Sequence, residues 1–122
     1  MKQTSWLLLF FFQVLTHTSA QVSCDELKEY VQKEDYGMTY YSYSSEAITK
    51  VSFHEITDDS YDTYYFAIVQ FTSSFQEYIY QVDSSTKFNY SMDYMSSAGK
   101  AFWKHINPYK DVLGCAPDIK QE

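Results

Sequence analysis

The chain has 122 residues, with 16 acidic side chains against 9 basic ones, and it contains no arginine. A formal net charge of −7 without arginine disfavours nucleic acids and anionic membrane surfaces as partners, because both are bound through cationic side chains. The length is enough for one domain with one hydrophobic core.

Residues 1–20 are predicted to be an export signal. Lys2 supplies the positive start, Trp6–Phe12 forms most of a short apolar core, and Ala20 ends a small-residue cleavage site. The apolar core is too short to anchor the chain across a bilayer. The mature chain would then be residues 21–122, with a net charge of about −8, in a secreted or periplasmic location.

Two cysteines, Cys24 and Cys115, stand near the two ends of the mature chain. An even cysteine count in an exported chain predicts a disulfide. Closing a loop of roughly 90 residues stabilises the fold by at most about 4–5 kcal/mol in the chain-entropy model. A competing interpretation makes Cys24 a lipidated N-terminus, but the three residues before it lack the leucine usual in a lipobox.

A helix is expected directly after the export signal. Ser23 and Glu26 form a capping box at its start, and Gly37 suits its C-terminal cap. Its apolar stripe is narrow and consists of Leu27, Tyr30 and Val31. Such a helix should lie on the domain surface.

Strand periodicity follows. Four strands are expected, over residues 39–43, 48–56, 63–72 and 76–82, with turns at 57–62 and 73–74. The third strand carries apolar residues on both faces, with Tyr64, Phe66 and Ile68 on one and Tyr65, Ala67, Val69 and Phe71 on the other. It should therefore be central and covered on both sides.

Two short helices are expected after the strands. The first starts near Ser84 or Ser85, and the second runs from Lys100 to Ile106, ahead of Pro108. Apolar residues of these helices should cover one face of the sheet: Phe88, Met92, Met95 and Phe102. The tail after Cys115 is polar and should be loosely held. The predicted fold class is α+β, with an antiparallel sheet of about four strands, an N-terminal helix and two short C-terminal helices.

Residues 45–109 resemble the KTSC domain, a short module named for its place at the C-terminus of some lysyl-tRNA synthetases. Three segments carry the resemblance in order: the opening strand Ser45–Phe53, the Tyr78-Ile79-Tyr80 motif with Val82, and Ser97–Phe102 with Ile106 and Tyr109. The chain then divides into a signal peptide (1–20), an N-terminal helix and first strand (21–44), the KTSC-like domain (45–109) and a C-terminal tail (110–122).

The resemblance implies the fold but no established function, and RNA binding is only a suggestion attached to the family. Three positions depart from the family pattern, where Asp83, Trp103 and Asn107 replace a proline, an asparagine and a basic residue. The acidic charge and the export signal also disfavour RNA binding.

Signatures of known catalytic or metal sites are missing from the sequence, so no cofactor or metal is expected. His54 and Glu55 are neighbours on a strand and point to opposite faces, and His105 lies near a helix end, where a cation suits the helix dipole. A cluster of acidic residues, Asp58, Asp59 and Asp62, reads as a solvated turn and not as a calcium site, because it lacks EF-hand spacing.

Tyr78 and Tyr80 share one face of a strand, where they either pack in the core or offer a stacking platform. The candidate binding residues are Tyr78, Tyr80, Phe102 and Trp103. The leading hypothesis is a small exported, monomeric, non-catalytic module that binds an unknown protein, a peptide or a small apolar or sugar ligand. The alternative is a small extracytoplasmic hydrolase that uses His54 or His105, and RNA binding ranks third.

Overall fold

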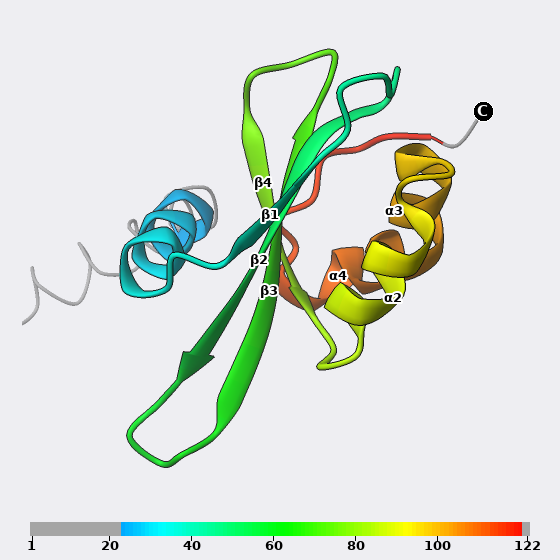
Figure 1. Cartoon of the computed structure of the whole chain (residues 1–122). Helices are drawn as coiled ribbons and strands as arrows, with labels where there is room; N and C mark the ends of the chain where they lie inside the picture. Colours follow the sequence, from blue (N-terminus) through cyan, green and yellow to red (C-terminus); the bar gives the residue numbers. More distant parts are fainter. Residues whose placement is uncertain (1–22, 121–122) are drawn as a thin grey trace, which may run out of the picture.

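A computed structural model describes residues 23–120, so the predicted export signal lies outside the described residues. The α+β prediction is confirmed: an N-terminal helix over residues 23–34 precedes a four-stranded antiparallel sheet, and short helices follow it (Figure 1). Within residues 23–120, no helix is long and apolar enough to cross a membrane.

The strands pair in sequence order. They are β1 (Met38–Tyr41), β2 (Ile48–Thr57), β3 (Thr63–Phe71) and β4 (Glu77–Val82), and each is antiparallel to the next. The sheet is followed by α2 (Thr86–Asp93), α3 (Ala98–His105), the 3-10 turn η1 (Asn107–Tyr109) and α4 (Lys110–Leu113). The described part of the N-terminal helix already includes Ser23 and ends at residue 34, and α3 begins two residues before the predicted Lys100.

The main hydrophobic core lies between one face of the sheet and the C-terminal helices (Figure 1). Val51, Phe53, Ala67 and Val69 project into it from β2 and β3 and are at most 5 % exposed. The core is completed by buried residues from β4 and the helices: Tyr80, Val82, Tyr90, Ala98, Ala101, Phe102 and Ile106. Alternating strand positions therefore supply this face, as the strand pattern predicts.

The prediction for α2 is wrong in its orientation. Phe88, Met92 and Met95 point away from the sheet and are 57 %, 68 % and 85 % exposed. Thr86 and Tyr90, one helical turn apart, face the core instead. The Thr86 hydroxyl accepts a hydrogen bond from the Asp83 amide at 3.1 Å, which fixes this rotation at the start of the helix.

The second face of the sheet is covered by the N-terminal helix. Val31 is fully buried there against Phe66, Ile68 and Ile79. Cys24, at the start of this helix, is disulfide-bonded to Cys115, with the two Cα atoms 5.7 Å apart. Both faces of β3 are therefore covered, as its apolar pattern predicts.

Residues 116–120 pack against the domain, whereas the sequence predicts a loosely held tail. Ala116 and Ile119 pack against the main core. The disulfide fixes the start of this segment, so the apolar side chains that follow stay near the sheet.

Gly37 connects the N-terminal helix to β1 in a conformation with φ +75°. A Cβ atom at this position would overlap the carbonyl oxygen of Phe53 and the ring of His54. Glycine is therefore required here for two reasons, its positive φ and the close approach of the chain to β2.

We expect Cys24→Ser, Cys115→Ser and the double variant to lose the same stability, because each opens the same loop. The loss should reach at most about 4–5 kcal/mol, the entropy of a loop of this size. Urea unfolding of the oxidised protein and the three variants measures it. Equal stability of the protein with and without a reducing agent would contradict this expectation.

Gly37→Ala should destabilise the protein more than Gly114→Ala. Both glycines have positive φ, +75° and +71°, but no atom lies within 4 Å of a Cβ built on Gly114. The strain of alanine at positive φ is common to both and is roughly 1 kcal/mol, whereas only Gly37→Ala adds overlap with β2. Thermal unfolding of the two variants should separate them, and equal losses would show that the connection moves aside freely.

Candidate functional site

The four aromatic residues predicted as a binding surface lie between the sheet and α3. Tyr80 and Phe102 are each 1 % exposed and meet edge to face, with ring centroids 5.7 Å apart. Tyr78 and Trp103 are half-buried and pack against the same core. Burial raises the pKa of Tyr80, whose hydroxyl has no hydrogen-bond partner within residues 23–120. These rings hold β4 against α3, and Tyr80 and Phe102 are closed to a ligand at the surface.

The residues that carry the KTSC resemblance occupy packing positions in the same region. The Ser97 hydroxyl caps α3 by accepting a hydrogen bond from the Lys100 amide at 3.2 Å. Gly99 allows a close approach to the segment before β2, since a Cβ there would lie 3.3 Å from the Cβ of Ala47. These motif residues account for how α3 docks on the sheet, and they identify no ligand.

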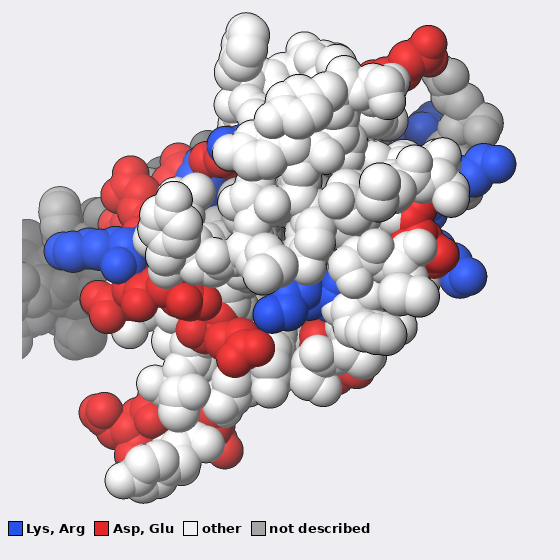
Figure 2. Space-filling model, viewed as in Figure 1, with Lys and Arg blue, Asp and Glu red and all other residues white. Residues whose placement is uncertain are grey.

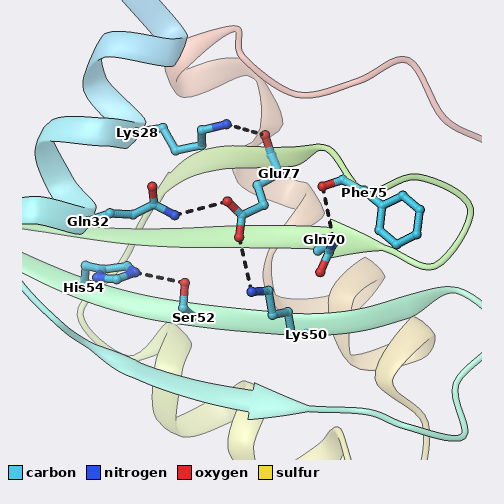
Figure 3. A network of polar contacts seen from close by, with 8 residues as sticks. All are labelled: Lys28, Gln32, Lys50, Ser52, His54, Gln70, Phe75 and Glu77. Atoms are coloured by element: carbon cyan, nitrogen blue, oxygen red, sulfur yellow. Dashed lines mark hydrogen bonds and ion pairs between the residues drawn. The ribbon is translucent and has the colours of Figure 1, made fainter.

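A row of polar side chains crosses all four strands on the face that carries the N-terminal helix. The register pairs Tyr41 with Lys50, Lys50 with Gln70, and Gln70 with Glu77. Directly paired residues of antiparallel strands point to the same side, so these four residues form one line, here called the polar row. Figure 3 shows Lys50, Gln70 and Glu77 on three neighbouring strands, beside the N-terminal helix.

Glu77 links the polar row to the N-terminal helix. Its carboxylate accepts from Lys50 Nζ at 3.4 Å and from Gln32 Nε2 at 3.2 Å, and its carbonyl accepts from Lys28 Nζ at 3.3 Å (Figure 3). The Lys50 and Glu77 side chains stay 32 % and 26 % exposed, and a pair so solvated contributes only about 0–1 kcal/mol. Its main effect is to cancel the two charges of the row.

Exposed aromatic rings lie at both ends of the polar row. At the β1 end, Tyr41 stacks on Tyr43 with centroids 5.6 Å apart and planes 5° from parallel, and the two residues are 50 % and 91 % exposed. At the β3–β4 end, Phe75 is 96 % exposed, and its carbonyl accepts a hydrogen bond from Gln70 Nε2 at 3.0 Å (Figure 3). Exposed aromatic rings that flank polar groups are typical of contact surfaces.

The stacked tyrosines also border a hollow of about 570 Å³. It lies between the β1–β2 connection and the start of α3, and serine and aromatic residues make up much of its lining. Tyr41 thus belongs both to the polar row and to the rim of this hollow.

His54 is buried and joined by hydrogen bonds to two neighbours. Its Nδ1 lies 2.7 Å from the Asp35 carbonyl, which can only accept, so Nδ1 carries the proton. In the neutral ring, Nε2 therefore accepts from the Ser52 hydroxyl at 2.9 Å (Figure 3). This arrangement orients Ser52 as a Ser–His pair does. However, β2 is paired on both sides at Ser52, so the local strand amides are committed to the sheet and are not free to form an oxyanion hole.

His105 pairs with Asp93 and joins the C-terminal ends of α2 and α3. Its Nε2 donates to Asp93 Oδ2 at 2.6 Å, and Lys104 Nζ lies 4.0 Å from the same oxygen. The hydrogen bond from His105 holds the pKa of Asp93 below its usual value, against a smaller opposing effect of desolvation. The His105–Asp93 pair therefore links α3 to α2.

The acidic turn between β2 and β3 is organised by Asp58. Its Oδ1 accepts hydrogen bonds from the amides of Ser60 and Asp62 at 2.9 and 3.0 Å, and its Oδ2 accepts from the Tyr64 hydroxyl at 3.2 Å. The bond to Asp58 raises the pKa of Tyr64. No group of His, Cys, Asp and Glu side chains within residues 23–120 is arranged to hold a metal ion.

Acidic side chains are unevenly distributed over the surface. Figure 2 shows them along the side of the N-terminal helix and at the tip of the β2–β3 hairpin, whereas the end of the sheet with the β1–β2 and β3–β4 connections is largely uncharged. The polar row and its exposed rings therefore lie at the less acidic end of the sheet.

Comparison of the chain with known proteins gives no match to a family model, to a curated protein or to a solved structure. The KTSC resemblance therefore stays a prediction.

The polar row is absent from the sequence prediction, which places the binding residues on the opposite face. Two weak signals point to it: Gln70 and Glu77 are polar positions at the ends of otherwise apolar strands, and both fall beside the same turn. Alternation also places Lys50 and Ser52 on one face of β2. Only the register across β2, β3 and β4 shows that these residues are neighbours.

Asp93→Asn should lower the melting temperature near pH 6, and the difference from the unchanged protein should fade in acid. A carboxyl whose pKa is lowered by folding stabilises the fold above its unfolded pKa, about 3.9, and loses this contribution as the pH falls through the lower folded value. Melting curves from pH 6 down to about pH 2.5 test this. Asp111→Asn, at an exposed position, is the matched control and should show no such convergence.

Proposed function

We propose that the protein is an exported, non-catalytic binding module whose ligand lies on the polar row. The observation that carries the proposal is the exposure of Tyr43 and Phe75, 91 % and 96 %, at the two ends of the row. Each ring could gain apolar contact only by meeting another molecule. Burying such rings yields about 25 cal/mol per Å² of apolar surface.

The covering of the sheet supports this location. Within residues 23–120, the hydrogen bonds from the N-terminal helix to the row go to Glu77, from Gln32 and Lys28, whereas Tyr41 is exposed and Lys50 is half-buried. On the opposite face the aromatic side chains pack against α2 and α3. A ligand on this face therefore finds polar groups, with exposed rings in the two connections at the same end of the sheet.

Two further features fit export. The Cys24–Cys115 disulfide suits an oxidising compartment, and residues 1–20 have the composition of an export signal. We propose a secreted or periplasmic location and a monomer. We also propose that residues 45–109 are an exported variant of the KTSC domain, whose motif residues here dock α3 on the sheet.

A hydrolase is the second candidate, and one observation favours it. The Ser52 hydroxyl donates to His54, whose other nitrogen is fixed by the Asp35 carbonyl. We rank it below binding because the strand amides around Ser52 are committed to the sheet and His54 is only 4 % exposed. The hydrolase is tested by measuring the release of p-nitrophenol from p-nitrophenyl acetate with the unchanged protein and with Ser52→Ala. Turnover by the unchanged protein that is lost in the variant would support the enzyme.

Binding can be tested by sedimentation with the insoluble envelope fraction of the source organism. We expect the protein to sediment with this fraction and the double variant Tyr43→Ala/Phe75→Ala to stay in the supernatant. The control is Tyr36→Ala/Tyr61→Ala, which removes two rings that are 96 % and 89 % exposed but lie away from the row. All four are surface positions, so melting temperatures should agree.

Equal sedimentation of both double variants would overturn the proposed site. Failure of the unchanged protein to sediment would overturn an envelope ligand.

A further inference from the structure

We infer that the ligand of the polar row is a neutral glycan chain built from hexoses with mainly equatorial hydroxyl groups. The inference rests on the proposed function and specifies its ligand. It is carried by the charge balance of the row, by its hydrogen-bonding groups, and by the placement of the rings at its ends.

Charge selects a neutral ligand. Lys50 and Glu77 lie 3.4 Å apart and neutralise one another, and the other two members, Tyr41 and Gln70, are uncharged at neutral pH. An anionic ligand would meet a protein of net charge −7 that lacks arginine. A cationic ligand would have to displace Lys50 from the Glu77 carboxylate. A neutral ligand is neither repelled by the net charge nor required to break the Lys50–Glu77 pair.

The hydrogen-bonding groups of the row match vicinal hydroxyl groups. Within residues 23–120, Lys50 uses one of its three N–H donors for Glu77, and the Gln70 amide uses one of its two for the Phe75 carbonyl. The free donors of Lys50 and Gln70 therefore lie beside the acceptor oxygens of Glu77, which Lys50 reaches across β3. A sugar hydroxyl both donates and accepts, so adjacent hydroxyls can bond to neighbouring members of the row.

The rings match the apolar faces of such sugars. When the hydroxyl groups of a hexose are equatorial, its axial C–H bonds form a flat apolar face that can stack on an aromatic ring. Tyr43, backed by the parallel ring of Tyr41, and Phe75 offer such rings. The row crosses three strand spacings, roughly 14 Å, which suits a short oligosaccharide better than one sugar ring.

An extended peptide fits this surface less well. Peptides that bind sheets usually add a strand at an edge, where backbone groups are unpaired. The polar row lies on the face of the sheet, and its central members are on β2 and β3, whose backbones are paired on both sides. A peptide here would have to rely on side-chain contacts alone.

Isothermal titration calorimetry of the exported chain with cellohexaose and laminarihexaose, two neutral oligomers of glucose, tests the inference, with an oligoglucuronate as the anionic comparison. We expect the neutral sugars to bind and the anionic one not to bind. Tyr43→Ala/Phe75→Ala should weaken binding by about tenfold to a hundredfold, because it removes both stacking surfaces. Tyr36→Ala/Tyr61→Ala should bind like the unchanged protein.

Gln70→Leu supplies a second variant that keeps the rings. It should lower the affinity for the neutral sugars several-fold, and binding by the unchanged protein should be almost insensitive to salt between about 50 and 500 mM. Binding of the anionic oligomer alone, or binding that salt abolishes, would overturn the neutral glycan.

The two levels of the proposal fail separately. If no sugar binds but envelope sedimentation still depends on Tyr43 and Phe75, the site stands and the glycan is wrong. If sedimentation is also insensitive to these residues, both the site and its ligand are wrong.

Discussion

The architecture depends on the burial of β3 from both sides. This strand carries apolar side chains on each face, so the sheet cannot be stable with only one layer of helices. The C-terminal helices cover one face with a large core, whereas the other is covered by a single helix with one fully buried residue, Val31. So narrow an apolar stripe buries little surface and stabilises the docked helix only weakly. The Cys24–Cys115 bond compensates by fixing the start of the helix to the segment that follows α4.

The open surface follows from the same arrangement. The described part of the N-terminal helix has 12 residues, which makes it about 18 Å long. Strands of 9 and 10 residues, as in β3 and β2, extend about 30 Å. The helix therefore covers only part of the second face, and the remaining part carries the polar row. Polar side chains at this end are consistent with that exposure, because the alternative would be uncovered apolar residues.

Much of the fold could be predicted because it depends on local pattern. Alternation located all four strands to within a few residues, and the even cysteine count after a predicted export signal indicated the bond. The rotation of α2 could not be predicted in this way, because Phe88 and Met92 are more apolar than Thr86, yet Thr86 faces the core through its hydrogen bond to the Asp83 amide. Apolar character alone does not reveal such a local bond.

The candidate site was harder to predict than the fold. Lys50 and Glu77 are far apart in sequence, and they meet across β3 only in one register. That register includes an irregularity between Ile48 and Lys50, where β2 gains one residue relative to β3. A shift of one residue would move Lys50 to the opposite face of the sheet. Composition and alternation carry no information about this insertion, so the row becomes visible only in three dimensions.

The position of Cys115 also has a consequence for the order of folding. During synthesis, Cys24 and the N-terminal helix emerge before the sheet, but their covalent partner follows all four strands and the helices after them. Until the bond to Cys115 forms, the helix is held to the second face by Val31, by the half-buried Leu27 and by a few hydrogen bonds, and Phe66, Ile68 and Ile79 are at risk of exposure. A chain with the sheet formed and the bond still open would therefore have one unsecured face. The apolar side chains of that face could then bind a chaperone or a neighbouring chain.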